Sequence, residues 1–307
     1  MSAMQAVQTT AEEILAYKEE KNVLILAHYY QNLEVQKIAD FVGDSFELAK
    51  RAKAAVQETV VFCGVRFMAE SAKILNPEKK VLLPVPHAGC PMADMIDAET
   101  VQAYRQKYPD AAVVCYVNSS AETKAVSDIC CTSSNAVRVV KSLPQKRIIF
   151  VPDKNLGAYV AGFVPEKEII CHSGFCPIHK NITVPEAQKA MREHPNALLA
   201  CHPECEAEVL ELADFIGSTS EILKFARTSE HKEFIIGTER GVCDRLNEEE
   251  PDKHFYLLSP QLVCPNMKKT ELSDVLHVLR TGENEIIMTE EEIRAAYAPL
   301  ARMVEIP

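Results

Sequence analysis

No apolar run in the 307-residue chain approaches the roughly 18 residues that a membrane-spanning helix needs. The first residues, MSAMQAVQTTAEE, have neither a basic start nor an apolar segment, so they do not resemble a secretory signal. Hydrophobic residues make up 47% of the chain and charged residues 25%, which is typical of a globular protein. We therefore expect a cytoplasmic protein without a membrane partner.

Positive charge is scarce, because 33 Lys and Arg stand against 44 Asp and Glu and the net charge is −11. Binding to a nucleic-acid backbone depends on clustered Lys and Arg that neutralise phosphates, and no such cluster is present. We therefore expect small molecules as partners, and no nucleic acid.

The chain has eleven cysteines, an odd number, but no C-x2-C pair. Without an export signal, cysteines serve metal binding, catalysis or core packing rather than a disulfide scaffold. A structural zinc site is normally closed by four ligands drawn from local pairs of this kind, so the missing pair argues against one.

Three cysteines are followed by proline and lie 86 and 88 residues apart, at Cys90, Cys176 and Cys264. The segments DFVGDS (40–45), DICCTS (128–133) and DFIGST (214–219) repeat with offsets of 88 and 86, as do the apolar runs that end at His28, Tyr116 and His202. A fixed internal period indicates repeated structural units. We predict three copies over 8–93, 94–180 and 181–268, and C-terminal helices within 269–307 that pack back on them.

Each copy is expected to alternate short strands with helices. The predicted strands cover 23–27, 60–63 and 81–85, then 112–116, 147–151 and 168–171, then 197–201, 233–236 and 254–258; two further helices are expected near 271–280 and 290–298. Short continuous apolar runs between helical segments indicate parallel sheets covered on both faces. The predicted fold class is α/β, with three pseudo-threefold-related α/β/α sandwich domains around a central active site.

Three repeat-matched thiolates predict a shared metal centre. Full ligation of an iron–sulfur cluster uses four ligands, so three thiolates on a [4Fe–4S] cluster leave one iron free to act as a Lewis acid. A local zinc site made by Cys171, Cys176, His172 and His179 is the alternative, although the repeat spacing favours Cys176 over Cys171 as the matched ligand. Other cysteines are expected in the core, at positions 63, 115, 130, 131, 201 and 243, while Cys205 is a candidate for the cavity wall.

Polar residues follow the predicted strands, where ligands bind in parallel sheets. His28 and His202 suit proton transfer near neutral pH, and Glu204 suits a general base. Helix starts are expected at 44–45, 132–133 and 218–219, where free N–H groups and hydroxyls favour anions. Simple helix capping and packing explain the same residues without a ligand. The candidates are His28, Tyr30, Asp44, Ser45, Tyr116, Asn118, Ser133, His202, Glu204 and Thr219.

Twelve motifs in order along the chain resemble one family, quinolinate synthase. They are AHYYQ (27–31), GDS (43–45), CGVRFMAE (63–70), GCPMADM (89–95), YVNSSAETKA (116–125), CTSSNA (131–136), PDKNLGAYV (152–160), GFCPIH (174–179), HPEC (202–205), GSTSEI (217–222), GTERG (237–241) and CPNMKK (264–269). The chain resembles the short form, which lacks the extra C-x2-C pair found near the last ligand in some relatives.

The resemblance implies a [4Fe–4S] cluster on Cys90, Cys176 and Cys264, and condensation of iminoaspartate with dihydroxyacetone phosphate to quinolinate with loss of phosphate and two waters. It implies proton transfer by Glu204 and Tyr30, assisted by Tyr116, and a cavity that Asp44 also lines. His28, His202 and Ser45 would hold the triose phosphate, and Asn118, Ser133 and Thr219 the dicarboxylate. An aspartate-oxidising enzyme that supplies iminoaspartate is the implied functional partner.

Two readings from other functional classes stay open at this point. A non-catalytic iron–sulfur sensor or carrier would use the same three cysteines without turnover. A zinc-dependent, aldolase-like lyase would use Cys171, Cys176 and His179 instead. Metal and sulfide content separates the zinc enzyme from the other two, and product formation separates the synthase from the carrier.

Overall fold

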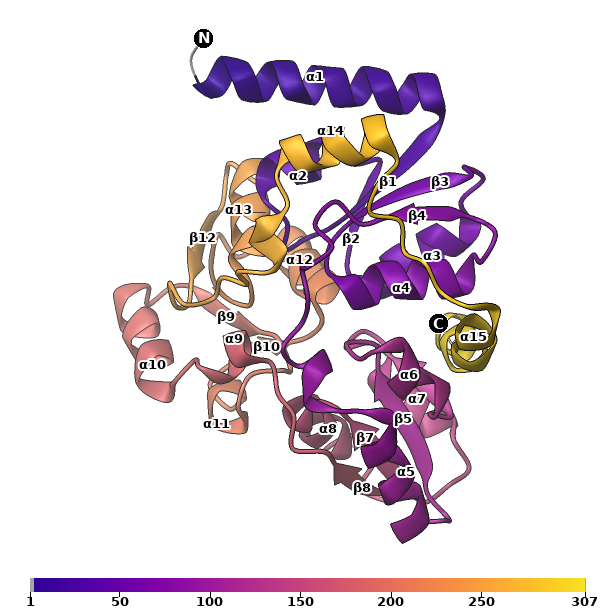
Figure 1. The fold of residues 1–307 in the computed structure, drawn as a ribbon. Helices are drawn as coiled ribbons and strands as arrows, with labels where there is room; N and C mark the ends of the chain where they lie inside the picture. The colour runs from indigo at the N-terminus through magenta and orange to yellow at the C-terminus, as the bar shows by residue number, and fades with distance from the viewer. Residues whose placement is uncertain (1–2, 307) are drawn as a thin grey trace.

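The computed structural model describes residues 3–306 and contains three four-stranded sheets in which all strands are parallel (Figure 1). The first sheet has the order β2-β1-β3-β4, the second β6-β5-β7-β8 and the third β10-β9-β11-β12, so one topology recurs three times. This arrangement confirms the predicted α/β class with three sheets. The exact domain boundaries stay a prediction.

The strands of the three sheets match one another in position. They are β1 (Val23–His28), β2 (Phe41–Gly43), β3 (Thr59–Cys63) and β4 (Lys80–Leu82); β5 (Ala112–Tyr116), β6 (Ile129–Cys131), β7 (Arg147–Val151) and β8 (Glu168–Cys171); and β9 (Leu198–Cys201), β10 (Phe215–Ile216), β11 (Glu233–Gly237) and β12 (His254–Leu257). The predicted strands are present within a few residues. The short edge strands β2, β6 and β10 were not predicted.

Helices cover both faces of the sheets. The first unit has α1 (Ala3–Lys21), α2 (Leu33–Ile38), α3 (Ser45–Ala54) and α4 (Arg66–Leu75); the second has α5 (Ala98–Lys107), α6 (Ala121–Ala125), α7 (Ala136–Ser142), α8 (Lys154–Ala161) and α9 (Pro177–Lys180); the third has α10 (Val184–Glu193), α11 (Ala207–Leu210), α12 (Thr219–Thr228) and α13 (Arg240–Glu249). The chain ends with α14 (Leu272–Thr281) and α15 (Glu290–Glu305). Within the described residues, no helix combines the length and apolar character needed to cross a bilayer.

The first sheet shows why its strands are apolar throughout. Leu24 and Leu26 of β1 pack in the cluster that contains α3 and α4. The alternate residues Ile25 and Ala27 face the opposite cluster, with Ile14 of α1 and the apolar side of α14. Because successive side chains of a strand point to opposite faces, a sheet covered on both sides needs apolar residues at every position.

Each of the repeated segments DFVGDS, DICCTS and DFIGST starts with an aspartate, and this aspartate makes the same hydrogen bond in all three units. Asp40, Asp128 and Asp214 each accept a hydrogen bond from a main-chain N–H at or near the start of the first strand of their sheet. The three N···O distances are 2.8, 2.7 and 2.8 Å. These carboxylates satisfy N–H groups that the sheet leaves unpaired, which explains their place in the repeat.

A lysine is repeated with the same spacing and caps one helix in each unit. Lys79, Lys167 and Lys253 point at the carbonyl groups that end α3, α7 and α12, with shortest N···O distances of 2.8, 2.6 and 2.7 Å. A cation at a helix C-terminus pairs with unsatisfied carbonyls and with the negative end of the helix dipole. This lysine repeat was not predicted from the sequence.

The two C-terminal helices bind the first unit in different places. α14 covers one face of the first sheet beside α1, and α15 lies between the first unit and α6 of the second (Figure 1). Leu300 and Met303 of α15 are fully buried, and Asn135 donates to the carbonyl of Met303 at 3.0 Å. α15 runs to Glu305, farther than predicted. Because it contacts both the first and the second unit, it joins the two.

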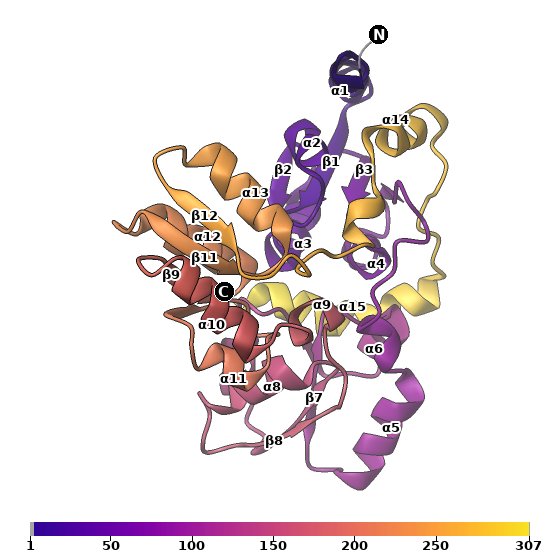
Figure 2. The same cartoon turned by 90° about the vertical axis from the view of Figure 1, so that its left-hand side faces the viewer.

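The three units surround a common centre. Both views show the first unit at the top, the third at the left and the second below them, with the short helix α9 near the middle (Figure 1, Figure 2). The carboxyl ends of the strands face this centre. The turns that follow the Cys-Pro pairs also meet there.

Candidate active site

One cavity lies where the three units meet, and every residue predicted for the site lines it. The first unit contributes His28, Tyr30, Asp44, Ser45 and Cys90; the second contributes Tyr116, Asn118, Ser133 and Cys176; the third contributes His202, Glu204, Thr219 and Cys264. The walls also include apolar side chains that were not predicted, among them Val65, Phe67, Met68, Met92 and Met267. The convergence is a structural fact, whereas the role of each residue stays a prediction.

The secondary structure explains how these side chains reach the cavity. His28 and Tyr116 end strands β1 and β5, and His202 follows β9 directly. Ser45 and Thr219 are the first residues of α3 and α12, capped by the preceding residues. The helix start predicted at 132–133 is wrong, because α7 begins at Ala136 after a turn in which Thr132 donates its N–H to Asn135 at 2.9 Å.

Each of the three cysteines that precede a proline begins a tight turn. The carbonyls of Cys90, Cys176 and Cys264 accept N–H groups three or four residues ahead, at 2.9, 2.9 and 3.1 Å. The main-chain N–H groups of the second and third residues after each cysteine face its sulfur and act to lower the pKa of its thiol. Proline at the intervening position has no N–H and a φ suited to such a turn, so the Cys-Pro pattern follows from the geometry.

The donor set fits a cluster held by three thiolates. Burial raises the pKa of Cys90 to about 12, and burial also raises the pKa of Cys176 and Cys264. A bound metal replaces the protons of such thiols, and N–H groups aimed at sulfur are a feature of iron–sulfur sites. The three cysteines are partly accessible from the cavity, whereas most other cysteines are buried.

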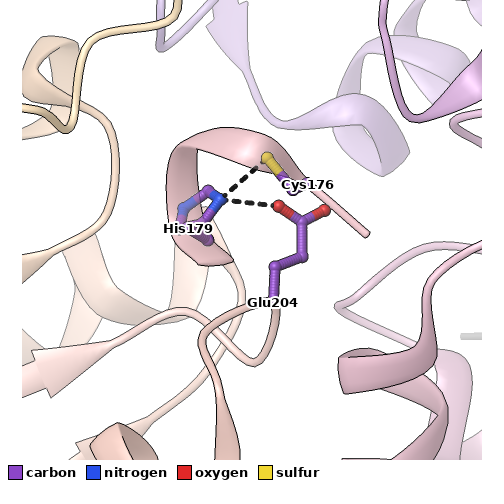
Figure 3. A group of neighbouring side chains, drawn as sticks. All are labelled: Cys176, His179 and Glu204. Carbon is purple, nitrogen blue, oxygen red and sulfur yellow. Dashed lines mark hydrogen bonds and ion pairs between the residues drawn. The ribbon is translucent and has the colours of Figure 1, made fainter. Parts of the chain in front are cut away.

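Glu204 is the centre of a buried hydrogen-bond network (Figure 3). Tyr116 donates its hydroxyl to one carboxylate oxygen at 2.7 Å. The other oxygen lies 2.8 Å from Nδ1 of His179 and 3.6 Å from Nδ1 of His202. All four side chains are at least nine-tenths buried, so these contacts form in a medium that screens charge poorly.

His179 continues the network toward the first unit. Its Nδ1 lies 3.2 Å from the sulfur of Cys176, and its Nε2 lies 3.0 Å from the hydroxyl of Thr238. Thr238 bonds the Tyr30 hydroxyl at 2.8 Å, and Tyr30 also bonds Thr219 at 3.1 Å. One continuous chain of hydrogen bonds therefore joins the two phenols, Tyr116 and Tyr30, on different units.

The charges in this network follow from burial and from the neighbours. Burial opposes the ionised form of Glu204, but His202, His179 and Tyr116 outweigh it and lower its pKa to about 2. Burial disfavours a charged His179, yet the Glu204 carboxylate dominates and raises the pKa of His179. Burial lowers the pKa of His202 to about 4 and that of His28 to about 3, so both are neutral at pH 7.

Two residues of this network were not assigned to the predicted site. His179 was considered only as a zinc ligand, although its position three residues after Cys176 on α9 places both on one side of a helical turn. Thr238 follows β11 and lies within the GTERG motif, at a strand end where site residues gather. Its partner Tyr30 lies 208 residues earlier in the chain, a contact that the repeat does not indicate.

The local zinc site of Cys171, Cys176, His172 and His179 is not assembled. Cys171 lines a separate outer cavity, and His172 bonds the carbonyl of Met95 and the hydroxyl of Tyr104. Among the described residues, the one compact group of candidate ligands is Cys176, His179 and Glu204, whose donor atoms lie within 4.8 Å of one another (Figure 3).

The remaining cysteines behave largely as expected. Those at positions 63, 115, 130, 131, 201 and 243 are at most 5% exposed, which confirms their assignment to the core. Cys205 is buried and lines the outer cavity near Cys171 rather than the central one.

Comparison with known proteins places this architecture in a family. The chain matches the family described as quinolinate synthetase A protein over residues 12–305. It is 54% identical to quinolinate synthase of Caldicellulosiruptor bescii over 98% of this chain and 99% of that protein. It is 53% identical to quinolinate synthase of Alkaliphilus metalliredigens over 96% and 97% of the two chains.

An archaeal relative agrees with the bacterial ones. Quinolinate synthase 2 of Methanosarcina acetivorans is 52% identical over 96% of this chain and 95% of that protein. Identity at this level over nearly the whole length, together with the family match, leaves one conclusion. The chain is an enzyme that belongs to the quinolinate synthetase A protein family.

Proposed function

We propose that the enzyme condenses iminoaspartate with dihydroxyacetone phosphate to quinolinate, releasing phosphate and two waters, in the cytoplasm. The family and the names of the relatives support synthesis of quinolinate. The convergence of three repeat-matched cysteines and the Glu204 network on one cavity carries the proposal. Iminoaspartate is labile, so an aspartate-oxidising enzyme is the source that we expect for it.

The proposed cofactor is a [4Fe–4S] cluster held by Cys90, Cys176 and Cys264. When bound, it would supply an iron with an open position that polarises oxygen or nitrogen groups as a Lewis acid. The sulfur-directed N–H groups of the three turns fit thiolate ligands, as described above. The same turns provide no fourth cysteine at the cavity.

Beside the carboxylates of Asp44, Glu204 and Glu239, neutral hydroxyl, amide and imidazole groups line the cavity and suit two anionic substrates. The buried oxygen Oδ1 of Asn118 has no hydrogen-bond partner among the described residues, which marks a place for a donor on a ligand. We assign the dicarboxylate to Asn118, Ser133 and Thr219, and the triose phosphate to His28, His202 and Ser45. At the start of α3 the Asp44 carboxylate already accepts the N–H groups of Phe46 and Glu47, and at the start of α12 the Ser218 hydroxyl accepts that of Glu221. We therefore expect the hydroxyls of Ser45 and Thr219, rather than these N–H groups, to meet a ligand.

Proton transfer is assigned to the network around Glu204. Its ionised carboxylate can accept a proton from a substrate carbon or nitrogen, while the Tyr116 hydroxyl that it holds can donate to a developing oxyanion. His179 and Thr238 connect Glu204 to Tyr30, so a proton can be passed between the two phenols without free water. Asp44 caps α3 and accepts from Ser134 at 2.9 Å, which fixes the wall beside Ser45.

Anaerobic purification followed by iron, sulfide and zinc analysis tests the cofactor. We expect four irons and four sulfides per chain and quinolinate formation from the two substrates. Zinc in place of iron would favour the lyase, and a complete cluster without quinolinate formation would favour the sensor or carrier.

Glu204→Gln tests the general base. Loss of a positioned proton acceptor lowers turnover by about 10²–10⁴-fold, so we expect at least a hundredfold loss with the iron content unchanged. Glu206→Gln is the matched control, because Glu206 lies two residues away and pairs with Lys154 outside the central cavity. Wild-type turnover by Glu204→Gln with an intact cluster would exclude the assignment.

A further inference from the structure

Two fully buried carboxylates contact the cysteine turns and take no part in the function proposed so far; one of them, Glu239, also borders the central cavity. Asp153 and Glu239 are 0% exposed and 86 residues apart, the spacing of the second and third repeats. Asp153 caps α8 and Glu239 caps α13. A buried carboxylate is costly unless its oxygens are fully hydrogen-bonded, so the partners of these oxygens are informative.

Each carboxylate divides its two oxygens between a helix and a cysteine. One oxygen of Asp153 accepts the N–H of Leu156 at 2.7 Å, and the other accepts the N–H of Cys176 at 3.2 Å. One oxygen of Glu239 accepts the N–H of Gly241 at 2.6 Å, and the other accepts the N–H of Cys264 at 3.2 Å. Helix capping needs only the first oxygen.

The first unit lacks this device and serves as an internal comparison. The equivalent residue is Val65, which caps α4 without a side-chain hydrogen bond. There the N–H of Arg66 bonds the carbonyl of Ala88 at 2.8 Å, so the helix holds the loop before Cys90 through the main chain alone. The three cysteines are thus supported unequally, because all three units have this main-chain bond but only Cys176 and Cys264 also have a carboxylate bond.

Glu239 also forms an ion pair with a third partner. Lys268, in the turn that follows Cys264, lies 3.2 Å from the oxygen of Glu239 that also accepts the N–H of Gly241. The Lys268 ammonium also donates to the carbonyl of Tyr30 at 2.8 Å. The Cys264 turn and the loop that carries Tyr30 are therefore joined through one ion pair, whose carboxylate is buried and whose ammonium is partly exposed.

We propose that Asp153 and Glu239 are positioning residues, which fix the main chain of Cys176 and Cys264 so that both sulfurs face the cavity and retain the cluster. The inference rests on the proposed [4Fe–4S] cluster. Partners that orient metal ligands contribute about 10–100-fold to metal affinity in known sites. We expect an effect of that size on cluster retention.

The test compares Asp153→Asn with wild type and with Asp128→Asn. An asparagine has one acceptor oxygen, so it keeps only one of the two N–H partners of Asp153. Asp128 is the matched control, because in the same unit it also accepts a main-chain N–H, at 2.7 Å, without contact to a cysteine turn. All three proteins are reconstituted anaerobically, and the rate of iron release to a chelator is measured.

We expect Asp153→Asn to release iron about tenfold faster or more than wild type, and Asp128→Asn to match wild type. The electron paramagnetic resonance spectrum of the reduced cluster should change in Asp153→Asn alone. Equal release rates and equal spectra in all three proteins would overturn the positioning role. If Asp153→Asn fails to fold, Glu239→Gln replaces it under the same criteria, and a wild-type protein without iron would instead refute the proposed cluster.

Discussion

Thr238→Val removes the hydroxyl that joins Tyr30 to His179 and keeps the shape of the side chain. Thr238 is 0% exposed, so water cannot replace the lost group. Tyr30 keeps its bond to Thr219 at 3.1 Å, but Nε2 of His179 loses its recorded partner. A buried polar atom left unpaired costs about 1–3 kcal/mol, and the lost bond to Tyr30 adds about 1 kcal/mol.

The expected loss of stability is therefore about 2–4 kcal/mol. For a chain of 307 residues this corresponds to a fall of about 3–6 °C in the thermal midpoint, measured by scanning calorimetry on the metal-free protein. Quinolinate formation should fall by about tenfold or more, because the chain of hydrogen bonds between the phenols is broken.

Thr270→Val is the matched control for this prediction. Thr270 is also 0% exposed, but its hydroxyl oxygen has no hydrogen-bond partner among the described residues. Removing an unsatisfied hydroxyl is neutral or stabilising, so the midpoint should stay constant or rise. If Thr238→Val and Thr270→Val gave the same midpoint and wild-type turnover, the network would have neither the structural nor the catalytic role assigned to it.

Three further changes test the scaffold and the metal ligands. Lys253→Met removes three hydrogen bonds to the carbonyls that end α12, and in a denaturant titration it should lower the free energy of unfolding by about 2–4 kcal/mol. Lys224→Met, on the exposed side of α12, should not alter that free energy. Leu300→Ala in α15 should cost about 2–5 kcal/mol in the same denaturant titration, and a loss below 1 kcal/mol would contradict its burial between two units. Cys90→Ser should abolish iron binding after reconstitution, while Cys63→Ser in the core should retain it.

The three sheets were predictable because each long strand is a continuous apolar run that recurs with the repeat. The edge strands were not, because β10 covers only Phe215–Ile216 and β2 only three residues. A segment of two or three residues is too short to show the pattern of apolar residues that identifies a strand. The aspartate before each edge strand was visible in the repeat, but its bond to the neighbouring strand depends on pairing that only the folded chain shows.

The position of the candidate site was predictable for a topological reason. Residues that follow parallel strands meet at one edge of each sheet, and a threefold repeat brings three such edges together. The partners of those residues were not predictable, because the decisive contacts cross between units. Tyr30 of the first unit meets Thr238 of the third, and Tyr116 of the second unit meets Glu204 of the third, through orientations that no local pattern encodes.

The repeat separates residues that hold the fold from residues that distinguish ligands. At scaffold positions the three units keep one residue type, aspartate at 40, 128 and 214 and lysine at 79, 167 and 253, because each unit must satisfy the same main-chain groups. At cavity positions other than the three cysteines the units differ, most clearly at the matched positions of Tyr30, Asn118 and Glu204. Two unlike substrates would bind poorly to three identical walls, so we expect the proposed substrates to be distinguished at the positions that depart from symmetry.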